Sequence, residues 1–157
     1  MLLIRTIGRF MHLDRHLPYF LRGRVVTGFG RGGKQLGCPT ANIEEAVVEA
    51  LPTDFPCGVF YGLARVDGEQ VDNMVMSIGW NPQYQNEKKT LEVHLLRKFD
   101  KDFYGSMMDV LILGFIRPMA AFNSLDELRA AIASDIAIAG KELEQCDRQA
   151  LLQRFFQ

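Results

Sequence analysis

The order of the predicted elements constrains the fold more than any other feature of this sequence. Six short segments rich in β-forming residues follow one another, and a long helical pattern comes only after the last of them. These segments are residues 20–27, 40–43, 58–66, 71–78, 90–96 and 107–116. Because strands and crossover helices do not alternate, a mainly β fold is predicted: a closed, six-stranded antiparallel barrel of Greek-key type with a long C-terminal α-helix.

Local signals set the ends of several elements. Asp67-Gly68 lies between two of the β-rich segments and predicts a hairpin turn. Ser124 and Glu127 form a capping box at the start of the helix. Apolar residues then recur at helical spacing, which predicts a packed face consisting of Leu125, Leu128, Ile132, Ile136, Ala139 and Leu143. Residues 44–51 predict one or two further helical turns, and residues 81–89 a loop.

Length and composition indicate one ordinary globular domain. With 157 residues, we expect a single domain over 17–157, preceded by an extension over 1–16. A net charge of −1 argues against a nucleic-acid partner, and the longest aliphatic run, residues 110–116, is too short to span a membrane. Three cysteines without CxxC pairing favour a reducing compartment, the cytoplasm. Arginines in 1–16 leave mitochondrial targeting as the alternative, and we expect a monomer.

A glycine-rich segment follows the first predicted strand and is typical of a phosphate-binding loop. Gly28, Gly30 and Gly33 allow backbone amides to approach an anion closely, and Lys34 adds a positive charge. The spacing matches the dinucleotide fingerprint, but no helix is expected to open after it. It also matches a P-loop, except that Gln35 replaces the hydroxyl residue that would hold magnesium.

The metal ligands must then come from another part of the chain, and Thr40 and Asn42 are the candidates. In an extended segment, residues two apart point to the same face, so these two side-chain oxygens would lie together on a hard cation. The alternative is an ordinary glycine-rich hairpin loop in which Thr40 and Asn42 are turn residues.

The alternating segment 90–96 places a carboxylate and an imidazole on one face. Leu91, Val93 and Leu95 share one side of the strand, whereas Glu92 and His94 share the other. If that side faces the glycine loop, Glu92 is a candidate general base and His94 its partner. The alternative is that both side chains face water beside the two lysines at 88 and 89.

Other candidates depend on packing that the pattern does not fix. Arg117 at the end of the last strand would hold an anionic or planar ligand, or lie on a solvated rim. An aromatic ring could stack on a planar ligand or pack in the core; the candidates are Trp80, Tyr84, Phe103, Tyr104 and Phe122. Cys38, within the glycine-rich segment, is expected to be a packed thiol.

Three ordered motifs resemble those of riboflavin kinase, the ATP-dependent enzyme that makes FMN, in its monofunctional eukaryotic form. They are residues 28–42, which end in Pro39-Thr40-Ala41-Asn42, then Ser77-Ile78-Gly79-Trp80-Asn81-Pro82, and Thr90-Leu91-Glu92-Val93-His94. The resemblance covers residues 17–143, and three ordered motifs are more specific than any one of them.

The resemblance implies a role for each candidate. Glu92 would be the catalytic base, and Thr40 and Asn42 would bind the metal. The implied nucleotide-binding residues are Gly28, Gly30, Gly33, Lys34, Thr40, Leu95, Arg97 and Tyr104. Arg117 and Phe122 would contact the flavin. The family fold, a six-stranded barrel with a C-terminal helix, agrees with the strand count above.

The implied reaction is phosphorylation of the terminal ribityl hydroxyl of riboflavin by ATP, giving FMN and ADP. Mg²⁺ is the implied metal, with Zn²⁺ and Mn²⁺ as alternatives. Two other functions remain open: a silent flavin- or nucleotide-binding barrel, and a kinase for another small-molecule alcohol. Ala120 and Ala121 stand where relatives often carry polar residues, so flavin contacts from those two side chains are not implied.

Overall fold

The computed structural model describes residues 15–27, 40–80, 88–99 and 102–157. The predicted extension over 1–16 lies outside this range except for its last two residues, as does most of the predicted 81–89 loop. The elements are β1 (Tyr19–Val26), β2 (Ala41–Ile43), α2 (Glu45–Glu49), β3 (Gly58–Val66), β4 (Asp72–Trp80), β5 (Lys89–Leu95), β6 (Met107–Arg117), α3 (Leu125–Glu144) and α4 (Arg148–Phe155).

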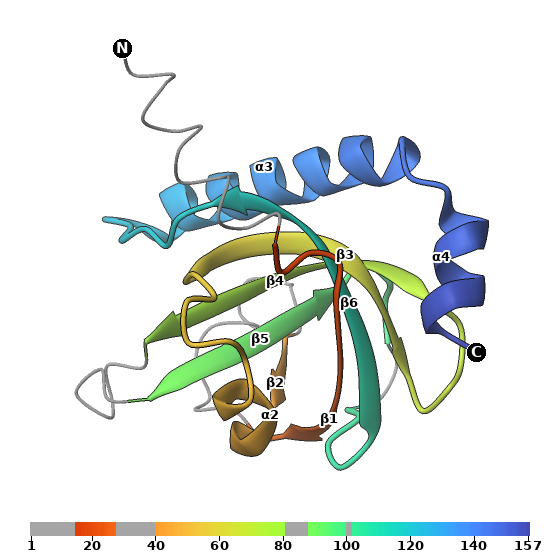
Figure 1. Cartoon of the computed structure of the whole chain (residues 1–157). Coiled ribbons are helices and arrows are strands. Elements are labelled where there is room, and N and C mark those ends of the chain that lie inside the picture. Colours follow the sequence, from red (N-terminus) through yellow and green to blue (C-terminus); the bar gives the residue numbers. More distant parts are fainter. Residues whose placement is uncertain (1–14, 28–39, 81–87, 100–101) are drawn as a thin grey trace.

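The six strands close into a barrel, as predicted (Figure 1). Their order around the barrel is β1-β2-β5-β4-β3-β6, and every neighbouring pair is antiparallel. In a ring of six strands with this order, β5 lies opposite β6. Outward-facing residues of β5 and β6 therefore lie on opposite sides of the barrel.

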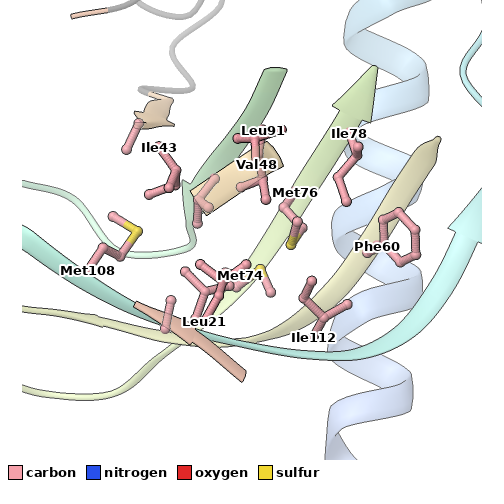
Figure 2. Packing of buried hydrophobic residues seen from close by; sticks show 14 of the residues in the cluster. Leu21, Ile43, Val48, Phe60, Met74, Met76, Ile78, Leu91, Met108 and Ile112 are labelled. Carbon is pink, nitrogen blue, oxygen red and sulfur yellow. The ribbon is translucent and has the colours of Figure 1, made fainter. Parts of the chain in front are cut away.

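The barrel interior is filled by alternate residues of every strand, as the period of two requires. Figure 2 shows these side chains pointing toward one another from different strands, among them Leu21, Met76 and Leu91. Val48 of α2 belongs to the same cluster, so this short helix packs on the core. The intervening residues of each strand face outward, where they can meet helices or ligands.

The predicted turn and helix cap are present. Asp67 and Gly68 have φ angles of 50° and 73°, and the Glu69 amide donates to the Val66 carbonyl at 3.0 Å, as in a tight hairpin turn. At the start of α3, Ser124 Oγ accepts from the Glu127 amide at 3.1 Å. The Glu127 carboxylate accepts at 2.9 Å from the amide of Asn123, one residue earlier than in the standard box.

Helix α3 lies across the outer faces of β3, β4 and β6 (Figure 1). Ala139 and Leu143 of its predicted apolar face are buried, but Leu125 is 56% exposed. The packed face therefore begins after the first turn of the helix. No helix among the described residues is both long and apolar enough to cross a membrane.

Helix α4 was not predicted from the sequence. Asp147 begins it by accepting from the Ala150 amide at 3.2 Å. Phe156 at its end packs with Leu63 and Leu111 on the outside of the barrel, and its ring meets that of Phe20 edge-on at 5.8 Å. The helix is short and its burial comes from residues around its end, so it lacks a clear apolar period.

Candidate active site

The candidate metal ligand Asn42 and the candidate base Glu92 are direct cross-strand partners. Asn42 of β2 pairs with Glu92 of β5, and Glu92 pairs on its other side with Ser77 of β4. The chain neighbours of all three belong to the barrel core, so the three side chains point outward. Directly paired residues on one face of a sheet have Cβ atoms about 4.5–5.5 Å apart. The fold thus brings together residues far apart in sequence.

The outward-facing residues Asn42, Glu92 and Ser77 form a row across three strands, and this row continues through β3 to β6. Ser77 pairs with Val59 of β3, and Val59 pairs with Arg117 of β6. With strands ~4.8 Å apart, Arg117 lies about 14 Å along the sheet from Glu92. A path of outward-facing residues therefore runs around the barrel from the candidate base to the predicted flavin-binding residue.

A change of register allows Arg117 to join this face. The β3–β6 pairing shifts between Val59 and Phe60, so that Phe60 pairs with Phe115 rather than Ile116. Phe115 packs against the barrel core, and without the shift Arg117, two residues later, would point the same way. The irregularity turns Arg117 outward, toward α3.

The Glu92 carboxyl is half-buried and withdrawn from most of the surrounding water. Burial raises its pKa. The lysines considered as its neighbours have other contacts: Lys88 forms an ion pair with Glu45 at 2.8 Å, and the Lys89 ammonium lies 5.0 Å from the Trp80 ring centroid. No ion pair or hydrogen bond to the Glu92 carboxylate occurs within the described part of the chain. A half-buried carboxylate that has no charged partner among the described residues is suited to accept a proton from a ligand.

His94 follows on the same outer face of β5. Its cross-strand partner is Val75, and burial lowers the pKa of its imidazole. The ring is therefore biased toward its neutral form, which can donate one hydrogen bond and accept another.

Thr40 and Asn42 offer neutral oxygen atoms for a cation. Both are half-buried; Thr40 directly precedes β2, and Asn42 lies within it. No group of three or more His, Cys, Asp or Glu residues that could hold a metal occurs among the described residues. A hydroxyl and an amide fit a hard cation that takes its remaining ligands from phosphate groups and water.

Arg117 and Phe122, both predicted to contact the flavin, lie against each other. The Arg117 guanidinium is 5.5 Å from the Phe122 ring centroid. Its Nε and one Nη each donate to the buried Asp135 carboxylate of α3 at 2.8 Å. Asp135 was not predicted, although an acid on the packing face of a helix, three residues after Ile132 and four before Ala139, was a usable signal.

The predicted nucleotide-binding residues on and after β5 have distinct environments. Leu95 is 3% exposed in the barrel core, so a nucleotide would reach only its main chain. Arg97 donates to Asp72 at 2.8 Å and lies 4.2 Å from the Phe99 ring centroid, whereas Tyr104 is half exposed. The remaining predicted nucleotide-binding residues, Gly28, Gly30, Gly33 and Lys34, lie outside the described residues, as do Cys38 and Tyr84.

Of the remaining aromatic candidates, Phe103 packs against the core, where its ring centroid is 4.9 Å from that of Phe99. Trp80 is 50% exposed at the end of β4, next to the row of outward-facing residues. Phe103 is therefore a core residue, whereas Trp80 is accessible to a ligand.

Comparison with known proteins gives one consistent family. Residues 15–143 match the flavokinase family, described as riboflavin kinase. The human riboflavin kinase is 55% identical over 83% of this chain and 84% of its own, and the mouse enzyme is 52% identical over the same shares. A crystal structure of riboflavin kinase from Trypanosoma brucei is 32% identical, covers 84% of this chain and 83% of that chain, and has a TM-score of 0.66.

Proposed function

The chain belongs to the riboflavin kinase family and phosphorylates riboflavin with ATP to give FMN and ADP, and we propose that Glu92 is the general base of this transfer. The observation that carries the proposal is the direct pairing of Glu92 with Asn42 on the outer face of the barrel. This pairing sets a proton acceptor beside a group suited to a metal–phosphate complex. Phosphoryl transfer needs these two features close together.

The proposed step uses the terminal ribityl hydroxyl as nucleophile. Its oxygen forms a bond to the γ-phosphorus of ATP while the bond from that phosphorus to the ADP oxygen breaks. The hydroxyl proton passes to the Glu92 carboxylate. Because burial raises the pKa of Glu92, the carboxylate holds a proton more readily than an exposed glutamate does.

The family uses ATP together with a divalent metal ion. We propose Mg²⁺, held by the Thr40 hydroxyl and the Asn42 side-chain oxygen, with Zn²⁺ or Mn²⁺ as substitutes. The bound ion neutralises charge on the phosphate groups. Neutral protein ligands support this assignment, because a nucleotide already carries the negative charge that a divalent cation requires.

The two ends of the row suggest where each substrate lies. The predicted glycine loop, with Gly28, Gly30, Gly33 and Lys34, would cover the phosphates next to Thr40, and Leu95, Arg97 and Tyr104 would bind the rest of the nucleotide. Arg117 and Phe122 would contact the isoalloxazine ring at the other end, beside α3. An acceptor with its hydroxyl at one end and its ring at the other would follow the path of about 14 Å along the curved sheet from Glu92 to Arg117.

An assay of FMN formation tests the reaction and the metal site together. The wild-type protein is expected to convert riboflavin to FMN only when both ATP and a divalent metal are present. Asn42→Ala should raise the Mg²⁺ concentration needed for half-maximal rate about tenfold, while riboflavin binding, followed by flavin fluorescence, stays unchanged. An unchanged metal dependence in Asn42→Ala would remove Asn42 from the metal site.

We further propose that the protein acts as a monomer in the cytoplasm, with no nucleic-acid or membrane partner. A net charge of −1 supports the absence of a nucleic-acid partner, because the chain has no overall excess of basic residues. Size-exclusion chromatography with light scattering should give a mass near 17.8 kDa.

A further inference from the structure

The buried carboxylate of Asp72 holds the side chain of Arg97, a residue that binds the nucleotide in the proposed function. We propose that Asp72 is a positioning residue that fixes the Arg97 guanidinium for the binding of ATP. Asp72 acts through Arg97 and does not touch the nucleotide itself. This inference rests on the proposed function, in which Arg97 contacts ATP.

The pairing of β4 with β5 brings the two residues together at one end of the barrel. Met74 pairs with Leu95 in the ladder. Because antiparallel partners step in opposite directions, two further residues along each strand set Asp72 opposite Arg97. The Arg97 Nε donates to the Asp72 carboxylate at 2.8 Å, as expected for direct neighbours.

The Asp72 carboxylate is itself held in place. The residue is 7% exposed, and its two oxygens have different partners. Oδ2 accepts from Arg97, and Oδ1 accepts from the Gln70 side-chain amide at 2.9 Å. Directly before Asp72, the Val71 carbonyl accepts from Arg148 of α4 at 2.7 Å. A buried carboxylate with both oxygens bonded has a fixed orientation, so it also fixes the group that donates to it.

The Arg97 guanidinium is fixed on one edge and one face but keeps its terminal nitrogen atoms for a ligand. Nε is bonded to Asp72, and the guanidinium carbon lies 4.2 Å from the Phe99 ring centroid. Within the part of the chain that the structure describes, neither Nη1 nor Nη2 donates a hydrogen bond, and the side chain is 34% exposed. A guanidinium that is fixed before binding loses less conformational freedom when it donates to oxygen atoms of a nucleotide.

Arg97 lies toward the same end of the barrel as Thr40, the proposed metal ligand. Strands β2 and β5 are antiparallel, with Ala41 paired to Val93. Thr40, one residue before Ala41, therefore lies in the direction in which β5 runs toward Arg97. Seen from Glu92, Arg97 is beyond Thr40, so it lies toward the adenosine part of an ATP whose γ-phosphorus is next to Glu92. A contact far from the transferred group is the same before and during transfer, so it affects the KM for ATP rather than kcat.

Steady-state kinetics of FMN formation test this role. Asp72→Ala should raise the KM for ATP about tenfold, while kcat and the KM for riboflavin stay within about twofold of wild type. Asp72→Asn keeps an oxygen that can accept from Arg97, so its KM for ATP should stay within about threefold of wild type. Asp109→Ala, the same change at another buried aspartate with arginine partners, is the matched control and should leave the KM for ATP unchanged. Each variant is assayed at a temperature at which circular dichroism shows it to be folded.

A double-mutant cycle separates positioning from a general loss of structure. Arg97→Ala should raise the KM for ATP about tenfold, and adding Asp72→Ala to it should have no further effect, because Asp72 acts only through Arg97. The inference is overturned if Asp72→Ala leaves the KM for ATP unchanged, or if the two increases multiply in the double variant. It is also overturned if Asp72→Ala raises the KM of both substrates equally, or if Asp109→Ala raises the KM for ATP as much.

Arg97→Ala alone tests the assignment on which the inference rests. If Arg97→Ala raises the KM for ATP and Asp72→Ala does not, only the role of Asp72 fails. If Arg97→Ala leaves the KM for ATP unchanged while FMN is still formed, Arg97 is not a nucleotide-binding residue and both assignments fail.

Discussion

At the scale of single residues, Glu92 combines a favourable position for chemistry with an unfavourable position for folding. Its carboxyl is half-buried without an ion pair from the described residues, and burial raises its pKa above the ordinary value of 4.5. A group whose pKa is higher in the folded than in the unfolded state binds more protons when folded. Its contribution to stability therefore decreases as pH rises above about 4.5.

We predict that Glu92→Gln stabilises the protein while it impairs catalysis. The neutral amide avoids the burial of a charge, so the variant should unfold at a higher temperature than wild type at pH 7. The difference should shrink as pH is lowered below 7, because wild-type Glu92 is then increasingly protonated. Thermal unfolding of both proteins across this range measures it, and a variant less stable than wild type at pH 7 would contradict the account.

A second prediction for a single residue concerns Asp135, the partner of Arg117. Asp135→Asn should lower the free energy of unfolding by about 2 kcal/mol, because it leaves the Arg117 guanidinium without its charged partner. It should also raise the KM for riboflavin more than the KM for ATP, because Arg117 and Phe122 are then less well held. Asp126→Asn, at an exposed position of the same helix, is the control. Equal effects of the two substitutions would remove Asp135 from the flavin site.

The residue scale also shows the limit of sequence reasoning. The alternation in 90–96 correctly placed Glu92 and His94 on one face and Leu91 on the other. The alternation did not predict which residues Glu92 pairs with on the neighbouring strands, because register depends on strands far apart in the chain. The alternation also did not predict the β3–β6 register shift that turns Arg117 toward α3. A period of two does not show where a strand has an extra, unpaired residue.

At the scale of elements, α4 packs on the outside of the barrel against β3 and β6. Arg65 donates to the Phe156 carbonyl at 2.7 Å, and its guanidinium lies 5.4 Å from the Phe156 ring centroid. Arg65 also pairs with the buried Asp109, as does Arg22. Burial alone would raise the pKa of Asp109, but the hydrogen bonds from both arginines outweigh it and lower that pKa. This cluster ties the C-terminal residues to β1, β3 and β6.

Phe156→Ala should therefore affect stability but not catalysis. The side chain is 6% exposed, and its loss should lower the free energy of unfolding by about 3 kcal/mol through the cavity that it leaves. The KM for riboflavin should not change, because Phe156 packs on Leu111 of β6, six residues before Arg117 in the strand. Denaturant unfolding and steady-state kinetics measure the two effects. Phe155→Ala, at a half-buried position, should cost less; a large rise in KM for Phe156→Ala would link α4 to the site.

The elements predicted from sequence and those observed agree where the local signals are strong. The hairpin at Asp67-Gly68 and the Ser124 cap are present because turn and cap chemistry depend on a few neighbouring residues. Helix α4 was missed because its stability comes from packing of Phe156 against distant strands rather than from an apolar stripe of its own.

At the scale of the whole molecule, the barrel interior stabilises the fold, while outward-facing residues form the candidate site. The apolar interior fixes six strands, and their outer residues then differ from side to side. Helix α3 lies across β3, β4 and β6, and α4 packs on β3 and β6, while the row Asn42, Glu92 and Ser77 lies on β2, β5 and β4 (Figure 1). The absence of βαβ alternation was enough to predict this closed architecture, because six consecutive antiparallel strands leave no edges when they close.

The central claim is that Glu92 accepts the proton of the ribityl hydroxyl, and the most direct test is single-turnover FMN formation by Glu92→Gln with ATP, Mg²⁺ and saturating riboflavin. The account predicts a rate about a hundredfold to ten-thousandfold below wild type, with riboflavin affinity within about twofold. FMN formation at the wild-type rate by a Glu92→Gln protein that binds riboflavin normally would contradict it.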